Sequence, residues 1–386
     1  AGLILLCLAY VLSQFFRAFL AVLSGPLALD VGATPDDLAT ASGLMFATFA
    51  LMQLPVGWAL DRVGPRRTAA VLLLLGGGGG AALFALASSP LHINLAMALI
   101  GAGCSPVLMA SYYIFARQFS AARFATLAAL MLGVGSFGNL VASYPMAWAA
   151  ETIGWRAALW GLAAVSVAAA LGILVLVRDP EAVGGDTRGS LLDLLKMPAI
   201  WAILPLMFVA YAPAAALRGL WAGPYLRDVF GLDTGQVGQA TLVMGVAMIA
   251  GTFAYGPLDR LFNSRKWVIF TGNVICMAAI FALMLWPDRS LGLSIALLAV
   301  IGLAGSTFPV LIAHGRAFFP AHLAGRGVTL LNLFGIGGVG VAQFASGPLH
   351  AAAPSALAGY IAIFALFGFA LLAGLVTYLW SRDSMA

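Results

Sequence analysis

Charged residues are scarce in this sequence. Only 9% of its 386 residues are Asp, Glu, Lys or Arg, whereas 62% are hydrophobic. Soluble domains usually carry about 25% charged and roughly 45–50% apolar residues. A water-soluble fold with so little charge would expose large apolar patches and aggregate. The composition therefore excludes a soluble protein and favours one whose exterior faces lipid.

Groups that support catalysis or metal binding are equally sparse. The three cysteines, Cys7, Cys104 and Cys276, lie far apart inside apolar runs, so we expect neither disulfides nor a metal site. The sequence has no phosphate-binding loop and no nucleophile–base constellation. We therefore expect no enzyme, no cofactor and no metal. The net charge of +5 is spread over alternate loops, which argues against a nucleic-acid partner.

Long apolar segments dominate the chain. A membrane-spanning helix needs about 20 mainly apolar residues. Segments of that kind fall near 3–29, 38–59, 68–89, 93–115, 124–148, 155–177, 199–226, 236–257, 267–286, 291–314, 327–348 and 354–380. They predict an all-α membrane protein of twelve transmembrane helices. We interpret the first as a membrane helix because it is too long for a signal-peptide core and shows no cleavage pattern.

The loop charges indicate an orientation. With a cytoplasmic start, fourteen Lys and Arg residues fall in cytoplasmic connections and only Arg156, Arg227 and Arg289 in outer ones. The positive-inside rule then predicts that both termini are cytoplasmic. We expect a monomer in a bacterial inner membrane, with the lipid bilayer as its surroundings. The remaining two arginines, Arg17 and Arg218, belong to neither set of loops.

The sequence also repeats itself at long range. Asp61-Arg62 and Asp259-Arg260 lie 198 positions apart, and each pair precedes a basic doublet. Glycine-rich segments correspond as well, one in the fifth span and one in the eleventh. We therefore predict two pseudo-symmetric six-helix bundles, 1–177 and 199–386. The cytoplasmic linker 178–198 joins them and ends in a possible surface helix at 191–196.

The segment from Gly57 to Arg67 resembles the signature loop of the major facilitator superfamily, written roughly G-x-L-A-D-R-x-G-R-R. Pro65 stands where that family commonly has a basic residue. Gly154-Trp155-Arg156 is similar to another recurring element of the family. The resemblance implies alternating access by two rocking bundles around a cavity lined by the first, fourth, seventh and tenth helices.

The same resemblance implies a cytoplasmic gate. A signature-loop aspartate in this family helps to hold the cytoplasmic side shut through helix ends and nearby arginines. Carried over, the gating residues would be Asp61, Arg62, Arg117 and Arg123, with Asp259 and Arg260 at the repeated position. A carboxylate near a helix N-terminus and a guanidinium is stabilised and can be released on movement. The alternative is a solvated loop carboxylate with only a topological role.

Two arginines interrupt the apolar spans. Arg17 follows Ala9-Tyr10 and Arg218 follows Ala210-Tyr211, and the two arginines lie 201 positions apart. A charge at this depth costs at least about 2.5–3.5 kcal/mol on insertion scales, so each is a candidate functional group. A guanidinium matches the oxygens of a carboxylate, phosphate or nitrate. The alternatives are outward snorkelling of Arg218 and purely structural binding of helix carbonyls.

Polar and aromatic side chains near these arginines complete the predicted binding site. They are Tyr10, Gln14, Tyr112 and Tyr113 in the first half and Tyr211 and Trp221 in the second. For each, packing or helix joining is the competing interpretation. The sequence predicts a transporter of a small anion, an organic carboxylate above all, bound by Arg17 and Arg218.

No carboxylate falls in a predicted membrane core. Carriers of protons and cationic drugs usually need one there, so its absence argues against both. A proton could instead travel with a weak-acid substrate or on His314. Two alternatives stay open: an exporter of amphipathic or neutral compounds in which the arginines are structural, and a non-transporting receptor or scaffold.

Overall fold

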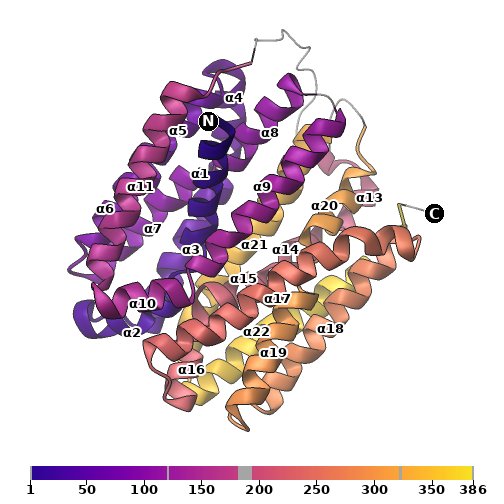
Figure 1. The fold of residues 1–386 in the computed structure, drawn as a ribbon. Helices are drawn as coiled ribbons and strands as arrows, with labels where there is room; N and C mark the ends of the chain where they lie inside the picture. Colours follow the sequence, from indigo (N-terminus) through magenta and orange to yellow (C-terminus); the bar gives the residue numbers. More distant parts are fainter. Residues whose placement is uncertain (1, 120, 181–193, 321–323, 385–386) are drawn as a thin grey trace. The chain divides into compact units, whose positions relative to one another are not determined.

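The computed structural model describes residues 2–119, 121–180, 194–320 and 324–384, apart from some side chains near the starts of two helices. Over this part the chain is helical and contains no strand. It divides into two compact units, Ala1–Gly185 with Asp233–Gln239, and Asp186–Leu232 with Ala240–Ala386. Each unit is a bundle of long helices (Figure 1).

The helices of the first unit follow one another through short connections. They are α1 (Gly2–Phe16), α2 (Leu20–Val31), α3 (Pro35–Leu51), α4 (Gln53–Arg62), α5 (Pro65–Leu72), the π-helix η1 (Leu73–Gly78), α6 (Gly79–Ala85), α7 (Pro90–Cys104), α8 (Val107–Gln118), α9 (Ala121–Val141), α10 (Tyr144–Thr152) and α11 (Trp155–Leu176).

The second unit contains the remaining helices, except that α17 begins within the first. They are α13 (Pro198–Trp201), α14 (Leu204–Ala210), α15 (Ala212–Ala216), the π-helix η2 (Leu217–Trp221), α16 (Ala222–Phe230), α17 (Thr234–Leu261), α18 (Arg265–Leu285), α19 (Leu291–Ala304), α20 (Phe308–Arg316), α21 (Ala324–Ala351) and α22 (Ala356–Tyr378).

These helices account for the predicted membrane spans. Among the described residues, ten helical segments are long and apolar enough to cross a membrane, and the bent pair of α1 and α2 makes an eleventh. The remaining predicted span, 124–148, is helical as α9 and α10. The predicted all-α membrane fold is confirmed. Of the predicted linker and surface helix, residues 181–193 lie outside the described part.

The internal repeat is visible in the backbone. Gly32 (φ 69°) ends α2 and Gly231 (φ 70°) ends α16, 199 positions later, both in the left-handed region. Gly64 (φ 96°) and Asn263 (φ 48°) precede α5 and α18 and are again 199 positions apart. Only residues that tolerate positive φ fit such turns, and Asn is the most tolerant after Gly. The two halves therefore share their turns as well as their helices.

The first, fourth, seventh and tenth spans are all interrupted. The first bends by 56° between α1 and α2, and the fourth breaks at Ser105-Pro106 between α7 and α8. The seventh breaks beside Tyr211 and then forms η2, and the tenth breaks between Ala304 and Phe308. The second, third and fifth spans are also irregular, at Met52, at η1 and at Ala142-Ser143, whereas α11, α17, α18, α21 and α22 are continuous. Discontinuous helices in transporters commonly line a substrate path.

Polar side chains from neighbouring helices satisfy the carbonyls that these breaks release. Gln53 donates from its Nε2 to the Ser105 carbonyl over 3.4 Å, and Tyr255 donates to the Ala304 carbonyl over 2.9 Å. In the seventh span, Gln343 donates to the Ala216 carbonyl over 3.4 Å. Backbone groups in lipid must find partners within the protein. The breaks are therefore built into the packing of each unit.

Candidate functional site

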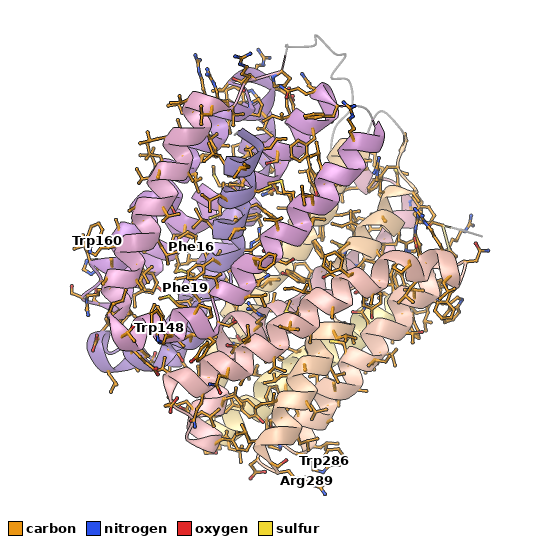
Figure 2. All side chains as sticks on the ribbon, in the orientation of Figure 1. Phe16, Phe19, Trp148, Trp160, Trp286 and Arg289 are labelled. Carbon is orange, nitrogen blue, oxygen red and sulfur yellow. The ribbon has the colours of Figure 1, made fainter. Side chains whose placement is uncertain are left out.

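Arg17 occupies the bend between α1 and α2. Its flanking residues Phe16 and Phe19 are completely buried and pack edge to face, 5.9 Å between ring centroids (Figure 2). Arg17 itself lies over the ring of Phe49 from α3, 4.4 Å from the centroid. Its Nε is buried and has no hydrogen-bond partner among the described residues. The bend thus holds a half-buried guanidinium whose buried Nε donor is unsatisfied.

Tyr10, Gln14 and Tyr112 form a polar group in the same unit. Gln14 donates from its Nε2 to the Tyr10 hydroxyl over 3.2 Å, one helical turn apart. The ring of Tyr10 occupies the space that a side chain at Gly135 of α9 would fill. Tyr112 lies within electrostatic range of Tyr10. The structure therefore brings three of the predicted substrate-binding residues together.

Arg218 lies in η2 and is 3% exposed. Its guanidinium packs against Gly245 of α17, where a β-carbon would approach Nη2 to 3.0 Å and Nε to 3.1 Å. The side chain is thus held inside the second unit rather than snorkelling outward. A π turn inside a helix is rare and is frequent at functional sites. Both arginines of the predicted pair therefore lie at irregular backbone and contact the second span of their own half.

The two aromatic residues predicted near Arg218 have different surroundings. Tyr211 is half-buried, at the break between α14 and α15, with its ring 5.0 Å from that of Phe308. Trp221 is completely buried, donates from its Nε1 to the Ser346 hydroxyl over 2.9 Å, and lies 5.2 Å from the His350 ring. Trp221 thus packs α16 and η2 against α21, whereas Tyr211 keeps an accessible edge.

The adjacent residues Tyr112 and Tyr113 have different neighbours, and Tyr113 lies at the end of the first unit that contains the signature-like loop. Tyr113 lies beside the Asp61 carboxylate, and Arg117 stacks on its ring with 4.1 Å to the centroid. Tyr113 therefore joins two predicted gating residues rather than Tyr10 and Gln14. Successive residues of an α-helix point about 100° apart, which explains why neighbours serve different places. The other two gating candidates of this unit, Arg62 and Arg123, are exposed.

Asp179 binds the start of α5. It accepts a hydrogen bond from the backbone N–H of Arg66 over 2.8 Å and lies 3.5 Å from the Arg66 Nε. The cap residue Gly64 has no side chain to perform this task, and a β-carbon added there would lie only 3.0 Å from the Asp179 carboxylate. Asp179 thus supplies the negative charge that a helix N-terminus favours.

The second unit repeats this arrangement with Asp383. Its carboxylate accepts from the backbone N–H of Arg265 over 3.2 Å at the start of α18 and from the Ser264 hydroxyl. The Nε of Arg265 contacts Asp259 over 3.1 Å. Asp259 therefore pairs with Arg265 rather than with its neighbour Arg260, which is exposed. The basic doublets of both signature-like loops are tied to the chain that follows the last helix of their half.

Hydrogen bonds join the end of the tenth span and the start of α18 to the C-terminal segment 378–382. His314 is completely buried, with Nε2 2.9 Å from the Arg382 carbonyl and Nδ1 2.6 Å from the Tyr378 hydroxyl. Lys266 donates to the carbonyls of Leu379 and Ser381 over 2.7 Å each. His314 thus joins the end of α20 to the C-terminal segment.

Two residues of this network were not predicted as functional. The contacts of Asp179 and Asp383 with the helix starts span 113 and 118 residues of sequence. A signal was nevertheless present, because each aspartate follows the last helix of its half, like a repeated element. Among the described residues, no three His, Cys, Asp or Glu side chains are grouped so that they could hold a metal ion.

The Gly154-Trp155-Arg156 element forms hydrogen bonds at the end of the first unit opposite the signature-like loop. Asp30 accepts from Trp155 Nε1 over 2.8 Å and from Arg156 Nη1 over 3.1 Å, while Arg156 Nη2 donates to the Ala87 carbonyl over 3.1 Å. This network joins the ends of α2, α6 and α11. Trp148, Trp160 and Trp286 are exposed on the outside (Figure 2), as expected of side chains that face lipid or its interface.

Comparison with known proteins identifies the family. The family model of the Major Facilitator Superfamily matches residues 6–342. A chloramphenicol resistance protein of Streptomyces lividans is 28% identical over 365 residues, which cover 86% of this chain and 83% of that protein.

Solved structures agree on the fold. A D-xylose–proton symporter superposes with a TM-score of 0.79 at 15% identity, covering 99% of this chain and 98% of that one. A bacterial homologue of the human lysosomal transporter Spinster, inward-facing and unoccupied, gives 0.76 at 17% identity, covering 98% and 94%. The chain therefore belongs to the Major Facilitator Superfamily and is a membrane transporter with the alternating-access fold.

Proposed function

We propose that this transporter moves a small anion across the membrane and that Arg17 and Arg218 bind it. The observation that carries the proposal is the repeated placement of these arginines. Each lies in the first span of its half, Arg17 at a bend and Arg218 in a π turn, and each packs on the second span of the same half. A charge at bilayer depth is costly, so its occurrence in both halves favours a functional role over a purely structural one.

The chemistry of the two side chains favours an anion. A guanidinium stays charged and offers a planar set of donors that matches carboxylate, phosphate or nitrate oxygens. The unsatisfied Nε of Arg17 is a donor of this kind, already buried. An organic carboxylate is the substrate class that we favour, because Tyr10, Gln14 and Tyr112 can contact the uncharged part of such a molecule. Tyr211 is the corresponding residue in the second half.

The gate belongs to the same proposal. We infer that Asp61, Arg62 and Arg117, together with Tyr113, act at the loop end of the first unit, and that Asp259 and Arg260 act with Arg265 in the second. Ion pairs at helix ends can break and reform when bundles move. The bonds from Asp179 and Asp383 would keep the two loops attached to their own bundles during that movement.

Transport by purified protein in liposomes tests the proposal. A panel of carboxylates, phosphate and nitrate should include at least one anion that is taken up and that also raises the thermal stability of the detergent-solubilised protein. Arg17→Gln and Arg218→Gln should each abolish that uptake, because removing one charge-assisted partner costs about 1.5–3 kcal/mol of binding or more.

Arg227→Gln is the matched control for this experiment. Arg227 lies on the same span as Arg218 but is part-exposed near the end of α16, where it pairs with Asp228 over 3.0 Å. Its replacement should leave anion uptake unchanged. Uptake that persists in both Arg17→Gln and Arg218→Gln would show that the arginines are structural, and the proposal would be wrong.

Export of a neutral or amphipathic compound is the second candidate function. The observation in its favour is the similarity to a chloramphenicol resistance protein. In that case the aromatic residues around Tyr211 and Phe308 would bind the substrate, and the arginines would be structural. Cells that produce the protein would then tolerate more chloramphenicol, and they would still do so with Arg17→Gln. If the increase in chloramphenicol tolerance disappears in either arginine variant, the exported compound and the anion would depend on the same site.

A further inference from the structure

An apolar groove lies between α1, α8 and α9 of the first unit. It encloses about 270 Å³ and has no polar lining surface; its walls are Leu3, Ile4, Cys7, Phe115, Leu127, Leu130 and Val134. Phe115 is 1% exposed and forms the floor, whereas Ile4 and Leu130 are 72% and 55% exposed. The groove is therefore open to the surface of the first unit; the three helices that form it are labelled in Figure 1.

The depth of the groove limits what can occupy it. From Leu127 to Val134, α9 rises by about 10 Å at 1.5 Å per residue. One leaflet contributes about 15 Å of the hydrocarbon core of a bilayer. The groove thus covers most of the hydrocarbon depth of one leaflet, and its wholly apolar lining offers nothing to a polar ligand. A lipid acyl chain has the shape and the chemistry to fill it.

A positively charged residue, Arg123, lies near the end of the groove where α9 begins. Arg123, Leu127, Leu130 and Val134 follow one another at spacings of four, three and four residues, which places them on one face of α9. Arg123 is exposed and has no hydrogen bond or ion pair among the described residues. Its neighbour along the chain, Arg117, is by contrast engaged with Tyr113. Arg123 is therefore available at the level where a lipid phosphate would lie.

We propose that this groove binds one acyl chain of an anionic phospholipid and that Arg123 binds the phosphate of the same molecule. A guanidinium pairs with phosphate through two parallel hydrogen bonds. The net electrostatic attraction is weaker for a zwitterionic lipid, because its headgroup also carries a positive charge. The site adjoins the proposed anion site, because the ring centroid of Phe115 on its floor lies 6.5 Å from that of Tyr112. It gives Arg123 a role in lipid binding rather than in gating.

Native mass spectrometry of the protein, purified and exchanged into defined lipid, tests this site. In mixtures of phosphatidylglycerol and phosphatidylcholine, the wild type should retain one phosphatidylglycerol in preference. Arg123→Gln should lower that preference about fivefold, since a basic residue near a lipid surface contributes about that factor. Arg67→Gln is the matched control: it removes an exposed arginine from the same end of the unit, away from the groove, and should change nothing.

The thiol of Cys7 provides a second readout inside the groove. Cys104 and Cys276 are buried, so a lipophilic maleimide should react mainly with Cys7, which is part-exposed and lines the groove. Added phosphatidylglycerol should slow this reaction, and phosphatidylcholine should slow it less. Leu127→Trp should fill the groove and remove retention of both lipids; Cys7→Phe should do the same if the tryptophan variant is produced poorly.

Three results would overturn the proposal. Equal retention of the two lipids by the wild type would remove the role of the phosphate. An equal loss in Arg123→Gln and Arg67→Gln would show a general effect of charge rather than a site. Protection of Cys7 by chloramphenicol but by neither lipid would make the groove an entrance for lipophilic compounds.

Discussion

The surroundings of Arg218 are unusually tight on one side. Gly245 leaves room for its guanidinium, and an added β-carbon would lie 3.0–3.4 Å from three of its atoms. Contacts at this distance require a small shift of the neighbour. Because Arg218 is 3% exposed, it has little free space into which it can move. The glycine therefore determines where the charge is presented.

Gly245→Ala tests this positioning. We expect expression to persist and the half-saturation concentration for the transported anion to rise on the order of tenfold, the equivalent of weakening one charge-assisted hydrogen bond. Gly256→Ala, on the same helix, is the control because no atom lies within 4 Å of its added β-carbon. A normal half-saturation concentration in Gly245→Ala would show that the anion does not depend on the position of Arg218.

At the scale of helices, the two aspartates that follow each half act as distant caps. Asp179 binds the start of α5, and Asp383 binds the start of α18. Each brings a negative charge to a helix N-terminus, an arrangement that contributes about 1 kcal/mol. Ser264 caps α18 as well, through the N–H of Trp267, whereas Gly64 provides no such help to α5.

Neutralising these caps should therefore have unequal effects. Asp179→Asn should lower the free energy of unfolding by about 1 kcal/mol, and Asp383→Asn by less because Ser264 remains. Thermal unfolding in detergent measures the difference, and about 2 °C is expected for the larger effect. Asp288→Asn serves as the reference, since Asp288 is exposed and has no hydrogen bond or ion pair among the described residues. Equal stability of all three variants would contradict the assignment.

For the whole molecule, the loop charges predict which end faces the cytoplasm. In a cysteine-free background, a cysteine at Asp288 should react with a membrane-impermeant maleimide in intact cells. A cysteine at Arg62 should react only after the cells are made permeable. Both positions are exposed, so accessibility does not favour either. The reverse pattern of labelling would invert the topology.

The sequence predicted the helices and the repeat because lipid imposes strong rules on both. Spanning segments need about 20 apolar residues, and their backbone groups must pair within the helix. The breaks were not predicted, although Pro106 and Pro309 lie near two of them. A proline is a local signal, but whether a span bends depends on partners such as Gln53 and Tyr255, which come from other helices.

The site was predicted in part for a similar reason. Depth alone marks Arg17 and Arg218, since any charge in an apolar run is conspicuous. The direction of a side chain requires the helix phase, and for this reason Tyr112 and Tyr113 were grouped although only Tyr112 lies near Tyr10. The domain boundaries, the orientation and the roles of the arginines stay predictions.

The unequal spacing within the first and seventh spans means that the two arginines do not occupy strictly equivalent positions. From Arg17 to the capping Gly32 there are 15 steps along the chain, whereas from Arg218 to Gly231 there are 13. The charge is therefore two residues closer to the turn in the second half, while the two turns themselves are 199 positions apart. Arg17 lies at the bend between α1 and α2, whereas Arg218 lies in the π turn η2. The two arginines are therefore held by different local backbones, and we expect that the two segments are not interchangeable between the halves.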